Sequence, residues 1–156
     1  MISGNKEAFK VIQQSTTPIY LGIDCSSRAI HGVWIDGEER IIAMLKWRSA
    51  DLEFDTRFIE ISLQFSKVEA AIFIQNPKST MEIASVVGGV RLACASNHIE
   101  CVSVDNRHWK KHVLGKGNCN KKDIKDFAVD KWGELFIEQD WADAACIALW
   151  RKRRAE

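Results

Sequence analysis

The sequence lacks paired cysteines and any long hydrophobic stretch. Its five cysteines form neither a C-x-x-C pair nor the spacing of a zinc site. We therefore expect reduced thiols, most of them small core residues, as in a cytoplasmic protein. No apolar run approaches the roughly 18 residues of a membrane helix, and no secretory hydrophobic segment follows a basic start. These absences predict a cytoplasmic protein with no membrane partner.

An excess of charge of one sign is also missing, because 22 basic residues balance 21 acidic ones and leave a net charge of +1. The basic residues are nevertheless unevenly distributed, and they concentrate in the segment 105–125 and in the tail 151–154. This asymmetry predicts either a positive surface for a polyanion or ordinary solvated helix faces. The basic tail also suits the C-terminal end of a helix.

Hydrophobic periodicity predicts one α/β domain over residues 18–156, preceded by a flexible arm over residues 1–17. The turn dipeptide Asp36-Gly37 predicts a hairpin, so the first three strands are expected to form an antiparallel meander in a mixed sheet. A Gly88-Gly89 pair inside one helix predicts close packing against another element. The predicted strands cover residues 19–25, 29–35, 40–47, 68–75 and 99–104. The predicted helices cover residues 52–65, 79–95, 107–113, 121–132 (capped by Asn120) and 140–151.

Three aspartates and one glutamine occupy positions that predict a common site. Asp24 ends the apolar run 19–23, and Gln75 ends the apolar run 70–74. Asp140 and Asp143 lie three residues apart, on one face of a helix whose other residues are small and apolar. Burying such acids against a sheet is costly unless a cation lies between them. The four residues together therefore favour a divalent metal site.

Each of these residues also has a purely structural interpretation. Asp24 suits an Asx turn or a helix cap. Gln75 suits a polar residue that leaves the core at the end of a strand. Asp140 and Asp143 suit the first turn of a helix, where the macrodipole favours acids. For each residue considered alone, the structural interpretation is the stronger one. The prediction of a metal site therefore depends on all four residues together.

Four motifs together resemble a known family. They are Leu21-Gly22-Ile23-Asp24, Ala71-Ile72-Phe73-Ile74-Gln75, the block 110–121 with its Lys-x4-Gly-x-Gly-x3-Lys spacing, and Asp140-Trp141-Ala142-Asp143-Ala144-Ala145. From residue 19 onward the chain resembles the RuvC-type Holliday-junction resolvases of the ribonuclease H-like superfamily. The resemblance implies a five-stranded mixed sheet, in which two parallel strands join the meander, flanked by helices. It also implies a bacteriophage member that acts in the cytoplasm of a prokaryotic or phage-infected cell.

The activity implied by the resemblance is a structure-selective DNA endonuclease that resolves four-way junctions by two-metal phosphodiester hydrolysis. Asp24, Asp140 and Asp143 match the family's metal-binding acids, with two Mg²⁺ per site and Mn²⁺ as a substitute. Lys110 and Lys121 match its two basic active-site residues, and Lys121 is expected to act in catalysis. Further lysines expected to contact DNA are Lys111, Lys116 and Lys122. The implied partners are four-way or branched DNA and a second copy of the chain in a homodimer, with the helix 79–95 as its candidate interface.

Gln75 departs from the family pattern, because it stands where the family carries a metal-binding glutamate. Its amide offers a neutral oxygen but no charge. The exchange is nearly isosteric, so folding and DNA binding are expected to survive while the rate falls by ~10² or more. We therefore predict a Mg-dependent endodeoxyribonuclease that is catalytically impaired in this chain.

Other functions stay open. The same acids also fit a nuclease for other branched DNA or for RNA–DNA hybrids on the same fold. A non-catalytic junction-binding protein would also agree with Gln75, because this residue supplies no charge to a catalytic metal. The start Gly22-Ile23-Asp24 also resembles a sugar-kinase or actin-like ATPase, although that class needs a second phosphate loop and a far longer chain.

Overall fold

A five-stranded sheet lies at the centre of the structure, in the order β3-β2-β1-β4-β5. The computed structural model describes residues 14, 16–26, 28–48, 68–73, 81–134, 136 and 138–155, with residues 68–73, 81, 82 and 155 described by their backbone alone. The strands are β1 (Ile19–Cys25), β2 (Ala29–Asp36), β3 (Ile41–Arg48), β4 (Val68–Phe73) and β5 (Cys101–Ser103). The helices are α4 (Met81–Ser96), α5 (Asn106–Leu114), α6 (Lys121–Trp132) and α7 (Gln139–Ala155).

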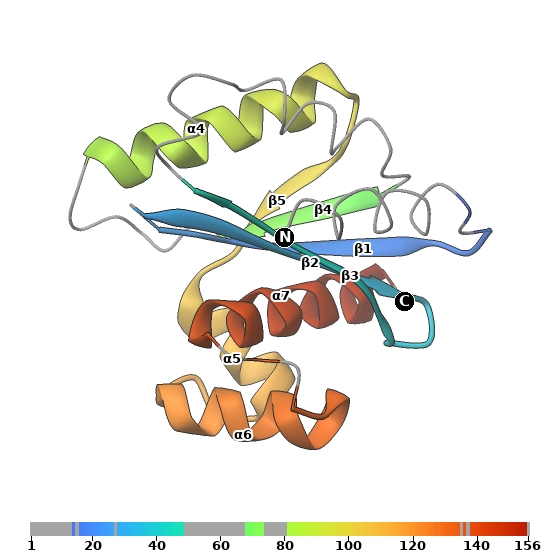
Figure 1. The fold of residues 1–156 in the computed structure, drawn as a ribbon, viewed down its shortest axis with the longest axis vertical. Coiled ribbons are helices and arrows are strands. Elements are labelled where there is room, and N and C mark those ends of the chain that lie inside the picture. Colours follow the sequence, from blue (N-terminus) through green and yellow to red (C-terminus); the bar gives the residue numbers. More distant parts are fainter. Residues whose placement is uncertain are drawn as a thin grey trace.

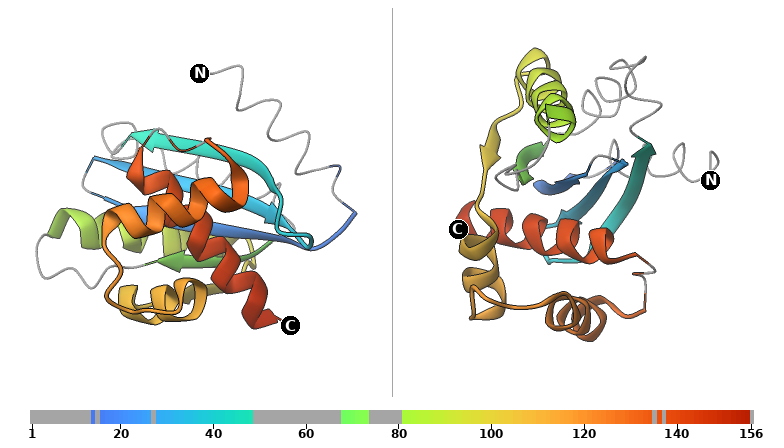
Figure 2. Two further views of the ribbon diagram at one scale, coloured as in Figure 1. Left: turned by 90° about the horizontal axis from the view of Figure 1, so that it is seen from below. Right: turned by 90° about the vertical axis from the view of Figure 1, so that its left-hand side faces the viewer.

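The sheet is mixed, as predicted. β1 pairs antiparallel with β2, and β2 pairs antiparallel with β3. On its other side β1 pairs parallel with β4, which pairs parallel with β5. Helix α4 covers one face of the sheet and α7 covers the other, while α5 and α6 lie outside α7 (Figures 1 and 2). The last helix of the chain is therefore an inner layer.

Alternation along β1 divides the core into two clusters. Ile19, Leu21 and Ile23 pack with buried residues of α4, whereas Tyr20 packs in the cluster that contains α7. Because side chains alternate between the two faces of a strand, the even-numbered positions of β1 face α7. Asp24 is the last of them.

Most predicted elements agree with the structure to within one or two residues, and α6 has the predicted bounds and the predicted cap. Asn120 accepts a hydrogen bond from the Asp123 backbone at 2.9 Å, and Asp123 accepts one in return from the Asn120 backbone. This reciprocal capping satisfies donors that the first turn leaves free. The predicted helix 52–65, most of the predicted arm 1–17, and residues 74 and 75 at the end of the fourth predicted strand lie outside the described residues.

Two predicted boundaries were wrong. The strand predicted over 99–104 is shorter, because the Ile99 backbone donates to the Cys94 carbonyl at the end of α4 and Asp105 caps α5. The last helix continues to Ala155 instead of ending at residue 151, because its basic tail is held by acids. Arg151 pairs with Glu100 at 2.8 Å, while the next two basic residues pair with Glu39 of the β2–β3 hairpin.

Gly22 allows α7 to approach the sheet closely. A Cβ atom at this position would lie 2.0 Å from the carbonyl oxygen of Ala144 and 2.4 Å from the backbone nitrogen of Ala148. These are backbone atoms of a buried helix, so neither can move aside easily. The absence of a side chain at Gly22 therefore sets the distance between β1 and α7.

The predicted close packing at Gly88-Gly89 is not found in the described part of the chain. A Cβ atom at either glycine would meet no described atom within 4 Å. The pair lies on the side of α4 away from the buried Val87 and Val90. The close backbone contact that was predicted for α4 is found instead at Gly22 in β1.

We predict that Gly22→Ala lowers the free energy of unfolding by about 2 kcal/mol or more, because the added methyl group overlaps the backbone of α7. The matched control is Gly37→Ala in the β2–β3 hairpin, which adds a methyl group where no described atom lies within 4 Å and should stabilise the protein by about 0.4–1 kcal/mol. Urea unfolding of both variants measures the two changes. Equal effects of the two substitutions would contradict the packing argument.

Candidate metal centre

Three carboxylates converge where β1 ends and α7 begins. Asp24 is the penultimate residue of β1, and Asp140 and Asp143 belong to the first turns of α7. One oxygen from each lies within 4.8 Å of the others. The sequence predicted this convergence for these three acids, and the structure brings them together.

The local fold explains why the acids meet. The contact of Gly22 with Ala144 and Ala148 aligns α7 with β1, so the first turns of the helix lie beside the end of the strand. Asp140 and Asp143 share a helix face because they are three residues apart. Gln139 restrains one of them, since its amide donates to Oδ1 of Asp143 at 3.3 Å.

The carboxylates are poorly compensated in the protein alone. Burial raises the pKa of Asp24 well above its usual value, and the charges of Asp143 and Asp140 raise it further. Burial also raises the pKa of Asp143 to about 6. Asp24 and Asp143 thus resist ionisation because of their surroundings. Oxygen donors this close together, in a site that disfavours their negative charge, fit a divalent cation.

Two of the predicted lysines lie near the acids. Lys121 at the start of α6 lowers the pKa of both Asp24 and Asp143, and Lys110 in α5 lowers that of Asp143. The ammonium of Lys110 also lies 5.6 Å from the centre of the Trp109 ring. Trp109 is fully buried, so its ring packs in the core and does not stack on a nucleic-acid base.

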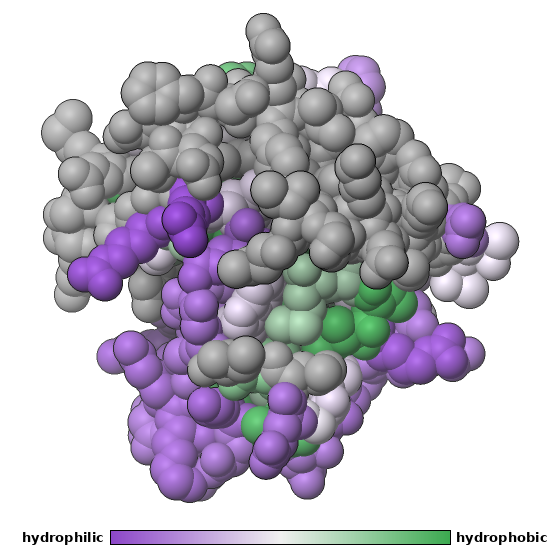
Figure 3. All heavy atoms as spheres, viewed as in Figure 1, coloured by the Kyte–Doolittle hydropathy of each residue, from purple (hydrophilic) through white to green (hydrophobic). Residues whose placement is uncertain are grey.

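The other three predicted lysines lie on the outer surface. Lys111 and Lys116 are exposed at the end of α5 and in the loop that follows it. Lys122 pairs with Asp126, one turn along α6, and is also exposed. Hydrophilic side chains dominate the lower part of the view in Figure 3, where α5 and α6 lie. All three lysines are therefore exposed to solvent on α5, α6 and the loop between them.

The fourth predicted metal position, Gln75, lies outside the described residues. The last described residue of β4 is Phe73, which is the register partner of Asp24. Strand β4 therefore finishes at the same end of the sheet as the acid cluster.

Three polar residues beside the cluster were missed by sequence reasoning. The buried His31 lies opposite Asp24 in the β1–β2 register. Its Nε2 lies 3.0 Å from Oε2 of Glu138, whose carboxylate also accepts two hydrogen bonds from the Lys46 ammonium. The sequence did contain one signal for His31. The connection between the first two predicted strands is short, so residue 31 has to lie opposite residue 24 in the antiparallel pair.

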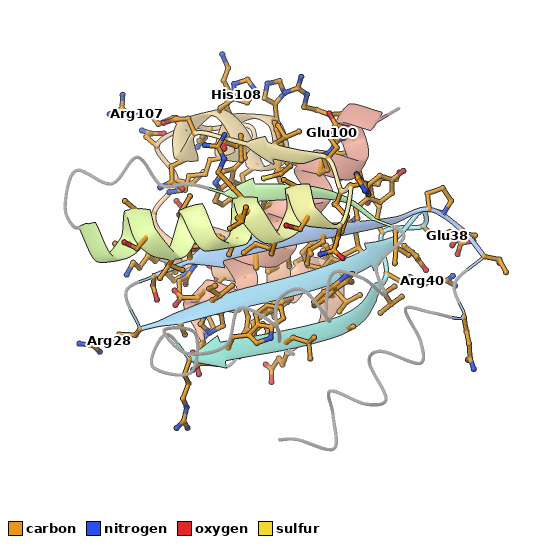
Figure 4. The ribbon with its side chains drawn as sticks, turned by 90° about the horizontal axis from the view of Figure 1, so that it is seen from above. Arg28, Glu38, Arg40, Glu100, Arg107 and His108 are labelled. Carbon is orange, nitrogen blue, oxygen red and sulfur yellow. The ribbon has the colours of Figure 1, made fainter. Side chains whose placement is uncertain are left out.

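A hollow of about 470 Å³ opens beside these residues. In Figure 4 the hollow is at the end of the sheet where Arg28 lies, and Glu38 and Arg40 lie at the opposite end. The lining residues are Ser26, Arg28, Ala29, His31, Lys46, Glu138 and Asp140. One acid of the cluster is thus reachable from outside.

Comparison with known families decides the assignment. The family model described as "Crossover junction endodeoxyribonuclease RuvC" matches residues 56–150, which include Asp140, Asp143 and both lysines near them. The chain belongs to the RuvC family. A curated RuvC from Brachyspira hyodysenteriae is 32% identical over 82 residues, which are 53% of this chain and 51% of the relative. The chain thus spans about half the length of the curated relative it matches.

Solved structures share the fold. RuvC from Thermus thermophilus matches with a TM-score of 0.75 at 15% identity, over 88% of this chain and 95% of that one. The same protein bound to a Holliday junction substrate matches with 0.74 at 17% identity, over 88% and 94% of the chains. The Holliday junction resolvase of fowlpox virus matches with 0.60 at 9% identity, over 87% and 99%. The fold is the predicted ribonuclease H-like fold of RuvC proteins.

No helix in the described part of the chain combines the length and the apolar character that a membrane crossing needs.

We predict that Mg²⁺ stabilises the protein more at neutral pH than near pH ~5. The raised pKa of Asp143, about 6, means that the folded state holds this proton more tightly than the unfolded state. Its contribution therefore favours folding in acid and is lost as the pH rises from its usual value of 3.8 through about 6. The metal needs the ionised form, so its stabilising effect should grow over the same interval.

Thermal unfolding at both pH values, with Mg²⁺ and with a chelator, measures this effect. The Asp143→Asn variant is the control, because it should unfold at a higher temperature than the parent without metal at neutral pH and lose most of the gain from Mg²⁺. A gain from Mg²⁺ that is the same at both pH values would count against a metal centre at these acids.

Proposed function

We propose that this chain is a divalent-metal-dependent endodeoxyribonuclease that resolves four-way DNA junctions. The observation that carries the proposal is the meeting of Asp24, Asp140 and Asp143, within 4.8 Å, in a member of the RuvC family. Buried acids with raised pKa values are typical of functional sites. Two lysines beside them supply positive charge where a phosphate backbone would approach.

The proposed roles follow from position and charge. Asp24, Asp140 and Asp143 would hold Mg²⁺, or Mn²⁺ in its place. Metal ions bound at such a cluster supply an activated water and stabilise charge on the leaving oxygen. Lys121 affects two of the acids electrostatically, so we place it beside the scissile phosphate as a point charge. Lys110 would orient the adjoining backbone.

The exposed lysines are proposed to bind DNA outside the reacting phosphate. Lys111, Lys116 and Lys122 are exposed residues of α5, of the loop after it and of α6. Contacts of this kind position the duplex without reading its sequence, and they weaken as salt increases.

Gln75 is proposed to occupy the remaining ligand position. It follows Phe73 by two residues, and Phe73 is the register partner of Asp24. A glutamine there keeps the shape of a glutamate ligand and removes its charge. We infer that this chain is folded and binds DNA but is catalytically impaired.

We predict that Gln75→Glu raises the Mg²⁺-dependent cleavage of a synthetic four-way junction by ~10² or more, because it restores one preorganised charge. Single-turnover rates on a mobile junction, with and without Mg²⁺, measure the change. Junction affinity in Ca²⁺ should change little, which separates catalysis from binding.

Two further variants, each made in the Gln75→Glu background, control this experiment. Asp24→Asn should abolish the gained cleavage while the junction is still bound. Lys122→Ala should weaken binding in a salt-dependent manner and leave the bound rate unchanged, whereas Lys121→Ala should lower the bound rate. If Gln75→Glu leaves cleavage at the parent level, position 75 is not a ligand.

A homodimer is proposed to present two such sites to the two-fold symmetric junction. The support is Leu92 of α4, the large hydrophobic residue that is 65% exposed within the described part of the chain. Gly88 and Gly89 on the same helix have open space around them in the described structure. An apolar and glycine-lined helix surface of this kind suits close helix–helix contact.

We predict that Leu92→Lys converts the dimer to a monomer, because it places a charge in the proposed interface. Light scattering at micromolar concentration measures the mass of both proteins, and Arg91→Lys, which keeps the charge of an exposed neighbour, is the control. A parent chain that is already monomeric would rule out this interface.

A further inference from the structure

His31 is held in one orientation by groups outside the acid cluster. Its ring is only 1% exposed, and its Nε2 lies 3.0 Å from Oε2 of Glu138. A carboxylate can only accept, so Nε2 carries the proton of this hydrogen bond. Lys46 fixes the carboxylate through contacts of 2.8 and 2.9 Å, and Trp141 packs edge-on against the imidazole ring at 4.8 Å.

The other ring nitrogen has no hydrogen-bond partner in the described structure. Nδ1 of His31 is buried and unpaired, and it lies 3.6 Å from Oδ2 of Asp140. With the proton on Nε2, Nδ1 of the neutral ring presents a lone pair. A buried acceptor without a hydrogen bond, next to a carboxylate oxygen, is explained by a cation that both atoms bind.

The arrangement is the one that proteins use to orient a metal-binding histidine. Such a histidine donates its far nitrogen to a carboxylate, which fixes the tautomer and makes the near nitrogen a better ligand. Two ligands of one ion, each at roughly 2.1 Å, lie between about 3 and 4 Å apart, so a separation of 3.6 Å fits. His31 and Asp140 both line the hollow that opens beside the cluster.

We propose that Nδ1 of His31 is an additional metal ligand beside Asp140, and that it makes the centre favour Mn²⁺ over Mg²⁺. This inference rests on the proposed metal-dependent function and adds a nitrogen donor to its oxygen ligands. Mg²⁺ takes oxygen ligands almost exclusively, whereas first-row transition ions accept imidazole. Glu138 and Lys46 are positioning residues, because they act through the histidine.

Pulsed electron paramagnetic resonance of bound Mn²⁺ tests the assignment directly. A coordinated imidazole gives nitrogen modulation of the spin echo, whereas an all-oxygen site does not. We expect the modulation in this chain and in Gln75→Glu, and its loss in His31→Gln. The chain has four histidines, and His108→Gln is the control that should keep the signal.

Calorimetry gives a second measure that does not depend on cleavage. His31→Gln should weaken Mn²⁺ binding by roughly tenfold or more and leave Mg²⁺ binding nearly unchanged. Glu138→Gln, which keeps the shape of the side chain, should weaken Mn²⁺ binding in the same direction while the protein stays folded by circular dichroism.

The outcomes separate this inference from the proposed function. If Mn²⁺ binds without nitrogen modulation, the inference is wrong and the nuclease proposal stands. That result would fit a charged imidazole ring that simply pairs with Glu138 and Asp140. If Mn²⁺ binds neither this chain nor Gln75→Glu, both proposals are wrong.

Discussion

The close contact between α7 and β1 is the constraint on which the rest of the structure depends. At Gly22 the helix backbone occupies the space where any other residue would place a side chain. Ala144 and Ala148, which make this contact, are themselves small and fully buried. Strand and helix are therefore held at a fixed separation and register. Asp24 follows Gly22 by two residues on the strand, and Asp140 and Asp143 precede Ala144 by at most four residues on the helix. The packing of β1 against α7 therefore brings the three acids together.

The position of α7 between the sheet and two outer helices limits where it can carry charge. From Ala144 to Trp150 every side chain is almost completely buried. Acids are tolerated only near the first turns, where the helix emerges and where its dipole favours negative charge. The dipole alone does not compensate them, since the pKa of Asp143 is still raised to about 6. The basic helices α5 and α6, packed on the outer side of α7, bring lysines to this end of the helix.

The sequence was most informative where a feature depends on local chemistry. The bounds of α6 follow from its capping box. The acid cluster was predicted from two acids on one face of a helix of small apolar residues, together with a third acid at the end of a buried strand. Features set by distant partners were not predictable. The length of α7 depends on Glu39, which lies more than a hundred residues earlier and holds its basic tail. The role of His31 depends on a strand register and on Glu138, and neither leaves a motif in the sequence.

The donor set implied by the proposals differs from a ring of carboxylates in its balance of charge. Three aspartates supply the negative charge, while Gln75 and His31 contribute neutral donors. A set with fewer charged ligands holds a hard ion such as Mg²⁺ less tightly, because the binding of this ion is mostly electrostatic. Ions that form stronger bonds to nitrogen lose less. A histidine beside the cluster would therefore offset part of the loss at position 75, which is a physical reason for this chain to carry both residues. The missing charge at position 75 and the nitrogen at position 31 would then together determine which metal the centre holds.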